Sequence, residues 1–400
     1  MRFDFNLYSS LLLPAFIQGM LFTVLLFIRS RQNGLSDRLL AWLLLLNTIK
    51  VAFWMLGFAG WYDSHNGYTS FMFYFPFNNL PWIGPLLYFY FLSLTNRDFR
   101  LGKRHWKHFI LPVAWSLLIL IKFLLDFGFY RPFGVTPDTQ YGCKGPLAEL
   151  DKSSLAVAVG FLSFFYYLFL TLRVFSSYRQ YMTNNFSATE DIQFNWLRNL
   201  LYMVSIGIII FFFFSLADLI THVTYRMDWY AYMAQGIIVY YLSIEGYYTL
   251  PRQLRKLQFQ PEVPVPVITV QDKEPDTVLD DWKARLVDLV ETKQPYLEPE
   301  LTLTDLARRL NTNTSVLSRV INDGTGRNFN DFINYYRVQE VISKFQSGEH
   351  HTQTLLAIAY DCGFNSKATF NRSFKKITGK TPREFADGLA GNISPATEQA

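Results

Sequence analysis

Two stretches of the C-terminal part contain the side chains whose types and spacing best suit a chemical task. In the first, LTLTDLARRLNTNTSVLSRVIN, helical spacing leaves Ser315, Ser318 and Arg319 facing outward. The second, TLLAIAYDCGFNSKATFNRSFKKITGKTP, repeats the pattern with a larger outward set: Lys367, Thr369, Asn371, Arg372, Lys375 and Lys376. Arg319 and Arg372 stand at equivalent places in the two copies and suit base edges, whereas the two adjacent lysines suit phosphate contacts or plain solvation. The predicted chemistry is binding of double-stranded DNA.

Each copy has the signals of a helix-turn-helix motif. In the first copy Thr302 is placed to cap a helix, with Asp305 at the third position of a capping box, and a short polar turn leads to a second helix. In the second copy Gly363 supplies a left-handed helix end, and either Asn365 or Ser366 caps the next helix. The apolar residues of both copies point inward. The outward residues therefore lie on the second helix of each motif.

The segment 329–346 between the two copies is predicted to be one helix with apolar residues on two faces. Such a helix is buried from both sides. At 1.5 Å per residue it is ~27 Å long, which can hold two recognition helices near the ~34 Å repeat of successive major grooves. One domain of this kind could place its two recognition helices in adjacent grooves.

These residues resemble the AraC-type transcription regulators over about 301–385. The matching marks are the LSRVIN helix and then Gly326, Phe329, Arg337, Ile358, Ala359, Gly363, Phe364, Phe370, Phe374, Lys375, Lys376, Gly379, Thr381 and Pro382. The resemblance implies a double helix-turn-helix that inserts its third and sixth helices into adjacent major grooves. It also implies base-facing or phosphate-facing positions at Ser315, Ser318, Arg319, Lys367, Ala368, Thr369 and Arg372. The chain departs from the family pattern at Phe385-Ala386, where Tyr-Arg is usual, and at Val341, where a small residue is common.

The N-terminal part has a different composition, because residues 1–250 hold 30 of the 38 phenylalanines and only 31 charged residues. Seven apolar runs approach the length of about 20 residues that a bilayer-crossing helix needs. The third run contains three prolines, so it either begins as late as Leu80 or contains a broken turn. The runs cover roughly 8–28, 39–60, 72–94, 109–127, 153–172, 199–220 and 229–250.

The basic residues of the short loops predict the orientation of these runs. One set of loops holds 14 Lys and Arg, against five in the opposite set. Since basic loops are retained in the cytoplasm, the N-terminus is expected outside and the C-terminal part inside a bacterial inner membrane. This half also resembles the seven-span sensor region that precedes such domains in some membrane-bound bacterial regulators.

The expected fold is all-α, a polytopic seven-helix transmembrane bundle followed by a cytoplasmic amphipathic helix and a double helix-turn-helix domain. The expected parts are a sensor domain over 1–250, a Pro-rich linker over 251–275, a connector helix within 276–300, the DNA-binding domain over 301–386 and a disordered tail over 387–400. The connector has one apolar stripe, so a homodimer through 276–294 is expected to pair two DNA-binding domains. Its opposite face is acidic, which leaves self-inhibition of the basic domain as an alternative.

Two charged residues stand out inside the predicted spans. Lys50 lies about 12 residues into the second run, hence ~18 Å from its cytoplasmic end, and Glu245 lies near the inner end of the seventh. Intramembrane charges are costly and commonly functional, so the two form a candidate polar pair. The alternative is that Glu245 reaches the inner surface by itself.

The leading interpretation is a membrane-embedded one-component regulator whose partners are DNA, membrane lipid and an unidentified signal ligand. An enzyme is not expected, because the sequence lacks G-x-S-x-G, phosphate-loop, H-E-x-x-H and kinase signatures. No cofactor or metal site is expected either. The alternative is a transporter or channel with a cytoplasmic regulatory helix-turn-helix domain, which would use Lys50, Glu245 and the interrupted third run.

Overall fold

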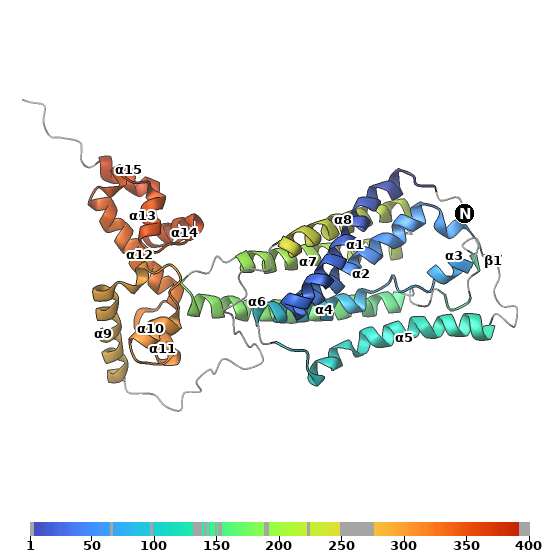
Figure 1. Ribbon diagram of the computed structural model, residues 1–400, viewed down its shortest axis with the longest axis horizontal. Coiled ribbons are helices and arrows are strands. Elements are labelled where there is room, and N and C mark those ends of the chain that lie inside the picture. The colour runs from blue at the N-terminus through green and yellow to red at the C-terminus, as the bar shows by residue number, and fades with distance from the viewer. Residues whose placement is uncertain are drawn as a thin grey trace, which may run out of the picture. The chain divides into compact units, whose positions relative to one another are not determined.

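The computed structural model describes residues 4–391 except 65–66, 97–98, 131–137, 140–141, 144, 149, 151–153, 188–191, 222–224 and 249–275. The predicted linker and the last residues of the predicted tail lie outside this described part. The chain divides into two compact units, one of residues 1–175 and 195–260 and one of residues 176–194 and 261–400 (Figure 1). The described part is almost entirely helical, which confirms the expected fold class.

The first unit consists of long apolar helices. Five stretches are long and apolar enough to cross a membrane: Leu7–Asn33, Leu35–Phe58, Lys103–Gly128, Leu155–Asn185 and Leu197–Ile220. This composition fits a membrane region, while the count of seven spans stays a prediction. The helices are α1 (Leu7–Asn33), α2 (Leu35–Phe58), α3 (Gly67–Met72), α4 (Leu80–Thr95), α5 (Ile110–Leu125), α6 (Ser154–Asn185), α7 (Ile192–Thr221) and α8 (Tyr225–Tyr248). Two strands of two residues each, β1 (Asp138–Thr139) and β2 (Gly142–Cys143), pair in antiparallel orientation.

The third apolar run takes the first of its two expected forms. Its helix, α4, begins at Leu80, with Pro81 in the first turn, where a proline costs no hydrogen bond. The preceding residues 73–79 form turns and irregular chain. At 16 residues α4 is shorter than the helices that qualify as candidate spans.

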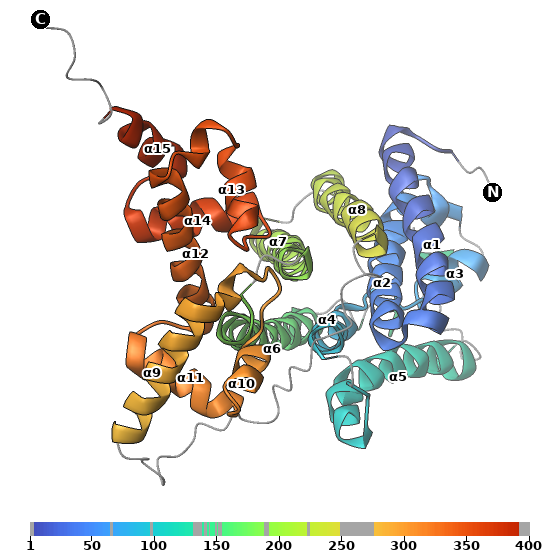
Figure 2. The same cartoon turned by 60° about the vertical axis from the view of Figure 1, so that its left-hand side comes forward.

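Helices α1, α2 and α8 pack side by side, as both ribbon views show (Figures 1 and 2). A small residue permits the close approach, since a Cβ added to Gly19 would lie 2.2 Å from Thr48 Oγ1 and 2.7 Å from Val239 Cγ1. Arg29 fixes the ends of the same helices, with its Nε atom 2.6 Å from the buried carboxylate of Asp37. Its guanidinium also donates to carbonyl oxygens at the end of α8. Close packing and the contacts of Arg29 therefore hold the three helices together.

The second unit contains two small cores joined by one helix. Its helices are α9 (Asp276–Lys293), α10 (Leu303–Arg309), α11 (Thr314–Thr325), α12 (Phe329–Gln346), α13 (Leu355–Asp361), α14 (Lys367–Thr378) and α15 (Pro382–Gly391). Helix α12 contributes to the core of α9–α11 and to that of α13–α15, as predicted for 329–346 (Figure 2). Helix α15 continues to Gly391, beyond the expected domain end at 386, and Leu389 packs on the second core.

Candidate nucleic-acid interface

The first helix-turn-helix has the local structure that its sequence predicts. The Thr302 hydroxyl accepts from the Asp305 backbone N–H at 3.1 Å and donates to the Asp305 carboxylate at 2.6 Å. The turn passes through Asn311 in the left-handed region (φ 53°), and Asn313 caps α11 by accepting from the Val316 N–H at 2.8 Å. Each capping side chain accepts a hydrogen bond from a backbone N–H that would otherwise be unpaired at the helix end. These caps set where α11 begins.

The outward face of α11 carries the three predicted side chains. Ser315 is exposed, and Ser318 and Arg319 are partly exposed, while Leu317, Val320 and Ile321 fill the core. Arg319 is 3.5 Å from the Asp323 carboxylate one turn later. Such an exposed pair is weak, so the guanidinium can leave it for another acceptor.

The second copy is built in the same way. Gly363 has φ 89°, as predicted for a left-handed helix end, and a Cβ there would lie 2.4 Å from the Tyr296 carbonyl oxygen. Of the two expected caps Ser366 is the one used, since its hydroxyl accepts from the Thr369 N–H at 3.1 Å. Cys362 behind this turn is fully buried, and burial raises the pKa of its thiol to about 12.

Most of the predicted residues of α14 face solvent, with one exception. Thr369 is only 1% exposed, and its hydroxyl lies 3.0 Å from the capping hydroxyl of Ser366. The expectation that Thr369 faces outward is therefore wrong, because the position next to the cap turns into the core. Lys376 is exposed and lies 2.8 Å from an Asp331 carboxylate oxygen on α12. The remaining exposed residues are Lys367, Ala368, Asn371, Arg372 and Lys375.

Arg337 joins α12 to the loop before α10. It is 1% exposed, its Nε–H donates to the Tyr296 carbonyl at 2.7 Å, and an Nη–H donates to the Glu298 carbonyl at 2.7 Å. Burial lowers its pKa to about 10. A buried guanidinium needs such acceptors, because an unsatisfied charge would be costly. The matching arginine of the sequence pattern is thus part of the scaffold and not of the outward face.

A segment that the sequence analysis did not single out also docks on α12. Just beyond the end of α6, the Ser187 N–H donates to the Leu301 carbonyl at 3.2 Å, and Phe186 pairs with Thr302 as an antiparallel bridge. The Asn330 side chain donates to the Ser187 carbonyl at 2.7 Å, and Arg337 donates to the Ser187 hydroxyl at 3.2 Å. We call residues 186–187 the docking segment.

The connector helix α9 does not leave its apolar stripe free. Leu286 and Val290 are fully buried in the core of the first motif, with Trp282 and Leu289 packed against it. The contact with α11 is close, since a Cβ on Gly324 would lie 3.2 Å from the Lys283 side chain. The stripe that was expected to pair two chains is therefore covered by its own chain. The physical reason is that the small first core needs this apolar area.

The structure does not bring the two intramembrane charges together. Lys50 lines a pocket beside Tyr232, and its Nζ lies 4.2 Å from the ring centre of Phe211. Glu245 is exposed and stands thirteen residues beyond Tyr232 on α8, which is ~20 Å along a helix. Lys50 is therefore a feature of the pocket and not a partner of Glu245.

Comparisons with known proteins agree with this geometry. Residues 306–388 match a family model described as a helix-turn-helix domain. Over 110 residues the chain is 28% identical to uncharacterized HTH-type transcriptional regulators of Staphylococcus aureus strains COL, MSSA476 and N315. The matched stretch covers 27% of this chain and 14% of each of those proteins. No solved structure matches.

The domain has two capped helix-turn-helix copies, one shared helix and basic residues on the outward faces of both second helices. Together these have the arrangement of a DNA-binding domain. The family match points to regulation of transcription and not to catalysis. The C-terminal part of this chain is an AraC-type helix-turn-helix domain.

Proposed function

We propose that this chain is a membrane-embedded transcription regulator that senses a signal at or outside the membrane and binds DNA sequence-specifically in the cytoplasm. One observation carries the proposal: α12 holds two equivalent recognition helices in one domain, and that domain is continuous in sequence with a unit of long apolar helices. A protein of this kind needs no second component to carry the signal between membrane and DNA.

The proposed DNA contacts divide into two kinds. Arg319 and Arg372, at equivalent places on α11 and α14, suit bidentate contacts with base edges. Lys367, Lys375 and the N-terminal end of α14 suit phosphates, since helix N-termini and ammonium groups attract anions. The hydroxyls of Ser315 and Ser318 complete the first face.

The proposal is tested by chromatin precipitation of the full chain in its host. We expect discrete sites for the natural chain and their loss for Arg372→Ala, because a lost bidentate base contact costs ~1–3 kcal/mol. Arg383→Ala is the matched control, since Arg383 is exposed on α15, where it lies 3.9 Å from the carboxylate of Asp387. Equal occupancy by the natural chain and Arg372→Ala would contradict the base-reading role.

The membrane placement is tested separately. The 14-to-five distribution of basic residues supports a cytoplasmic C-terminal unit. A reporter fused after Leu257 is expected to be active only inside the cell, and one inserted near Asn66 or Thr139 only outside. A reversed result for either insertion would contradict the proposed orientation, without bearing on DNA binding.

The docking segment supports a route for the signal. Helix α6 begins in the first unit and ends at Asn185, and Ser187 is bonded to Leu301 and α12 of the DNA-binding unit. We infer that movement of α6 changes how this segment sits on Asn330 and Arg337. Regulation would then act through the scaffold between the two motifs.

A further inference from the structure

The first unit contains a pocket of about 320 Å³ that the DNA-binding proposal does not use. Residues from every helix from α2 to α8 line it, together with the irregular chain before α4. This volume is at the low end of the range of small-molecule sites in proteins. A space between packed helices is a common setting for such a site.

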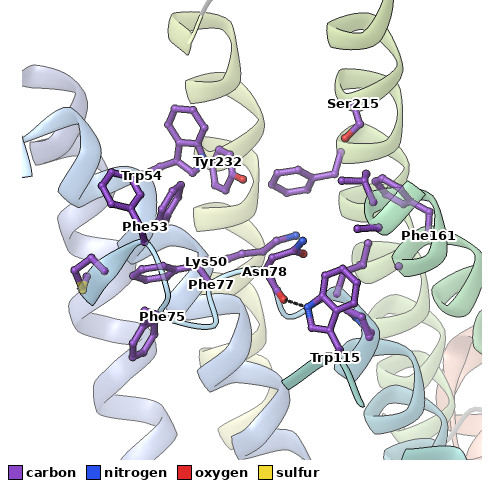
Figure 3. A pocket seen from close by; sticks show the side chains of 18 residues that line it. Lys50, Phe53, Trp54, Phe75, Phe77, Asn78, Trp115, Phe161, Ser215 and Tyr232 are labelled. Atoms are coloured by element: carbon purple, nitrogen blue, oxygen red, sulfur yellow. Dashed lines mark hydrogen bonds between the residues drawn. The ribbon is translucent and has the colours of Figure 1, made fainter. Parts of the chain in front are cut away.

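Half of the 18 residues that line the pocket are aromatic (Figure 3). Trp115 is fixed by a hydrogen bond from its Nε1–H to the Asn78 carbonyl at 2.8 Å. Phe53 packs on Phe77 with ring centres 4.8 Å apart, and Trp54 packs on Tyr232 at 4.9 Å. Rings held in this way present flat apolar surfaces, which suit an aromatic or compact apolar body.

Lys50 supplies a positive charge inside this apolar space. Its side chain extends from α2 into the pocket (Figure 3), and its Nζ lies 4.2 Å from the centre of the Phe211 ring. Within the part of the chain that the structure describes, no carboxylate lies within ion-pairing distance of Lys50. A ring face offsets only part of the cost of an ammonium group near mid-bilayer. A bound anion would offset more of that cost.

The charge of the site limits the kind of anion. Among the described lining residues Lys50 is the one cation, and Asn78 and Ser215 are neutral polar groups. A doubly charged phosphate would keep one charge without a partner in a low-dielectric space, where such a charge is costly. A monocarboxylate matches one ammonium group.

We propose that this pocket binds a small monocarboxylic acid with an aromatic or compact apolar body, held by Lys50 and the surrounding rings. Only the role of this acid as the sensed signal rests on the proposed function. Binding of the acid requires neither DNA nor the C-terminal domain. The helices that meet at the pocket include α6, whose far end leads to the docking segment.

The test uses the purified full chain in phosphatidylcholine nanodiscs, without DNA, and calorimetric titration with phenylbutyric acid at neutral pH. Empty nanodiscs correct for partition of the acid into lipid. We expect saturable binding of the acid and at least about tenfold weaker binding of phenylbutyramide, which keeps the shape and lacks the charge. Equal affinity for acid and amide would overturn the proposal.

Three variants locate the site. Lys50→Met, which keeps the stem and removes the charge, is expected to lower affinity for the acid about tenfold and to leave that for the amide unchanged. Ala156→Phe fills part of the pocket and is expected to weaken both, whereas Lys107→Met, at an exposed lysine outside the pocket, is expected to change neither. Unchanged binding by a folded Lys50→Met or Ala156→Phe protein would place the site elsewhere.

A second arm separates a free acid from a lipid headgroup. The titration is repeated in nanodiscs that also contain phosphatidylglycerol, and we expect the same affinity. Loss of acid binding there would overturn the proposal, since it would make the occupant an anionic lipid. Failure of any of these tests leaves the chromatin result unaffected, so the pocket and the DNA-binding proposal can fail separately.

Discussion

Replacing Asn330 by alanine should release the docking segment from α12. Asn330 is buried, with 7% of its surface exposed. Its side-chain amide donates to the Ser187 carbonyl at 2.7 Å and to the Phe186 carbonyl at 3.2 Å. At a net ~0.5–1.5 kcal/mol for each hydrogen bond, the loss is ~1–3 kcal/mol of docking free energy. That changes the docking equilibrium about 5-fold to 150-fold.

Hydrogen exchange of the full chain measures this change directly. The Ser187 N–H is protected by the Leu301 carbonyl at 3.2 Å, and it exchanges when the segment lifts away. We expect exchange in a peptide containing Ser187 to accelerate by the same factor in Asn330→Ala. Core amides of α12 around Val341 should stay protected, since Val341 is fully buried in the second core.

The matched control is Asn322→Ala, which removes the same group from the exposed face of α11. It is expected to leave exchange at Ser187 unchanged. If the Ser187 N–H of a folded Asn330→Ala protein exchanged at the rate of the natural chain, the hydrogen bonds of Asn330 would not stabilise docking. The proposed signal route would then have to be abandoned.

Three further predictions concern the second motif. Thr369→Val should lower the free energy of unfolding by ~0.5–1.5 kcal/mol and leave sequence preference intact on a panel of DNA sites, since the hydroxyl bonds the cap; altered preference would restore a base-reading role. Gly363→Ala should lower the free energy of unfolding by more than the ~1–3 kcal/mol that a left-handed backbone conformation costs, because the added Cβ would also meet the Tyr296 carbonyl. In thermal unfolding its loss of stability should exceed that of Gly326→Ala, where the added Cβ enters open space. Burial raises the pKa of the Cys362 thiol from 9.0 to about 12, so the stability that the protonated thiol contributes is complete below pH 9 and is lost as pH rises toward 12. The free energy of unfolding of the natural chain should therefore fall relative to that of Cys362→Ala between pH 9 and pH 12. A constant difference between the two proteins over that range would contradict the burial argument.

The local structure of the C-terminal unit could be predicted where neighbouring residues decide it. Thr302 and Ser366 cap helices because their hydroxyls reach N–H groups three residues on, and Gly363 ends a helix because it alone tolerates the backbone angle. The helix over 329–346 matches the sequence prediction at both ends, since its two apolar faces mark its whole length. Each of these signals lies within a few residues of its effect.

The remaining features depend on residues far apart in the sequence. Thr369 is an exception, because its expected outward position is contradicted locally: its side chain is buried, and its hydroxyl lies 3.0 Å from that of Ser366 three residues earlier. The apolar stripe of α9 was predicted correctly, but it packs on the core of the first motif of its own chain and was expected to pair with a second chain. Periodicity shows that a helix face is apolar and does not show what covers that face. Nothing near Lys50 in the sequence indicates that aromatic residues from five helices and a loop line the pocket around it.

The position of Ser187 also makes the DNA-binding unit discontinuous along the chain. Ser187 lies 114 residues before Leu301 and 150 before Arg337, so during synthesis it emerges from the ribosome long before the groups that hold it. The unit can be completed only after most of the polypeptide has been made. It is also not a simple cassette: a chimera that takes only residues 276–400 leaves the Asn330 amide without the two carbonyls it binds, so a faithful transplant has to bring the end of α6 with it.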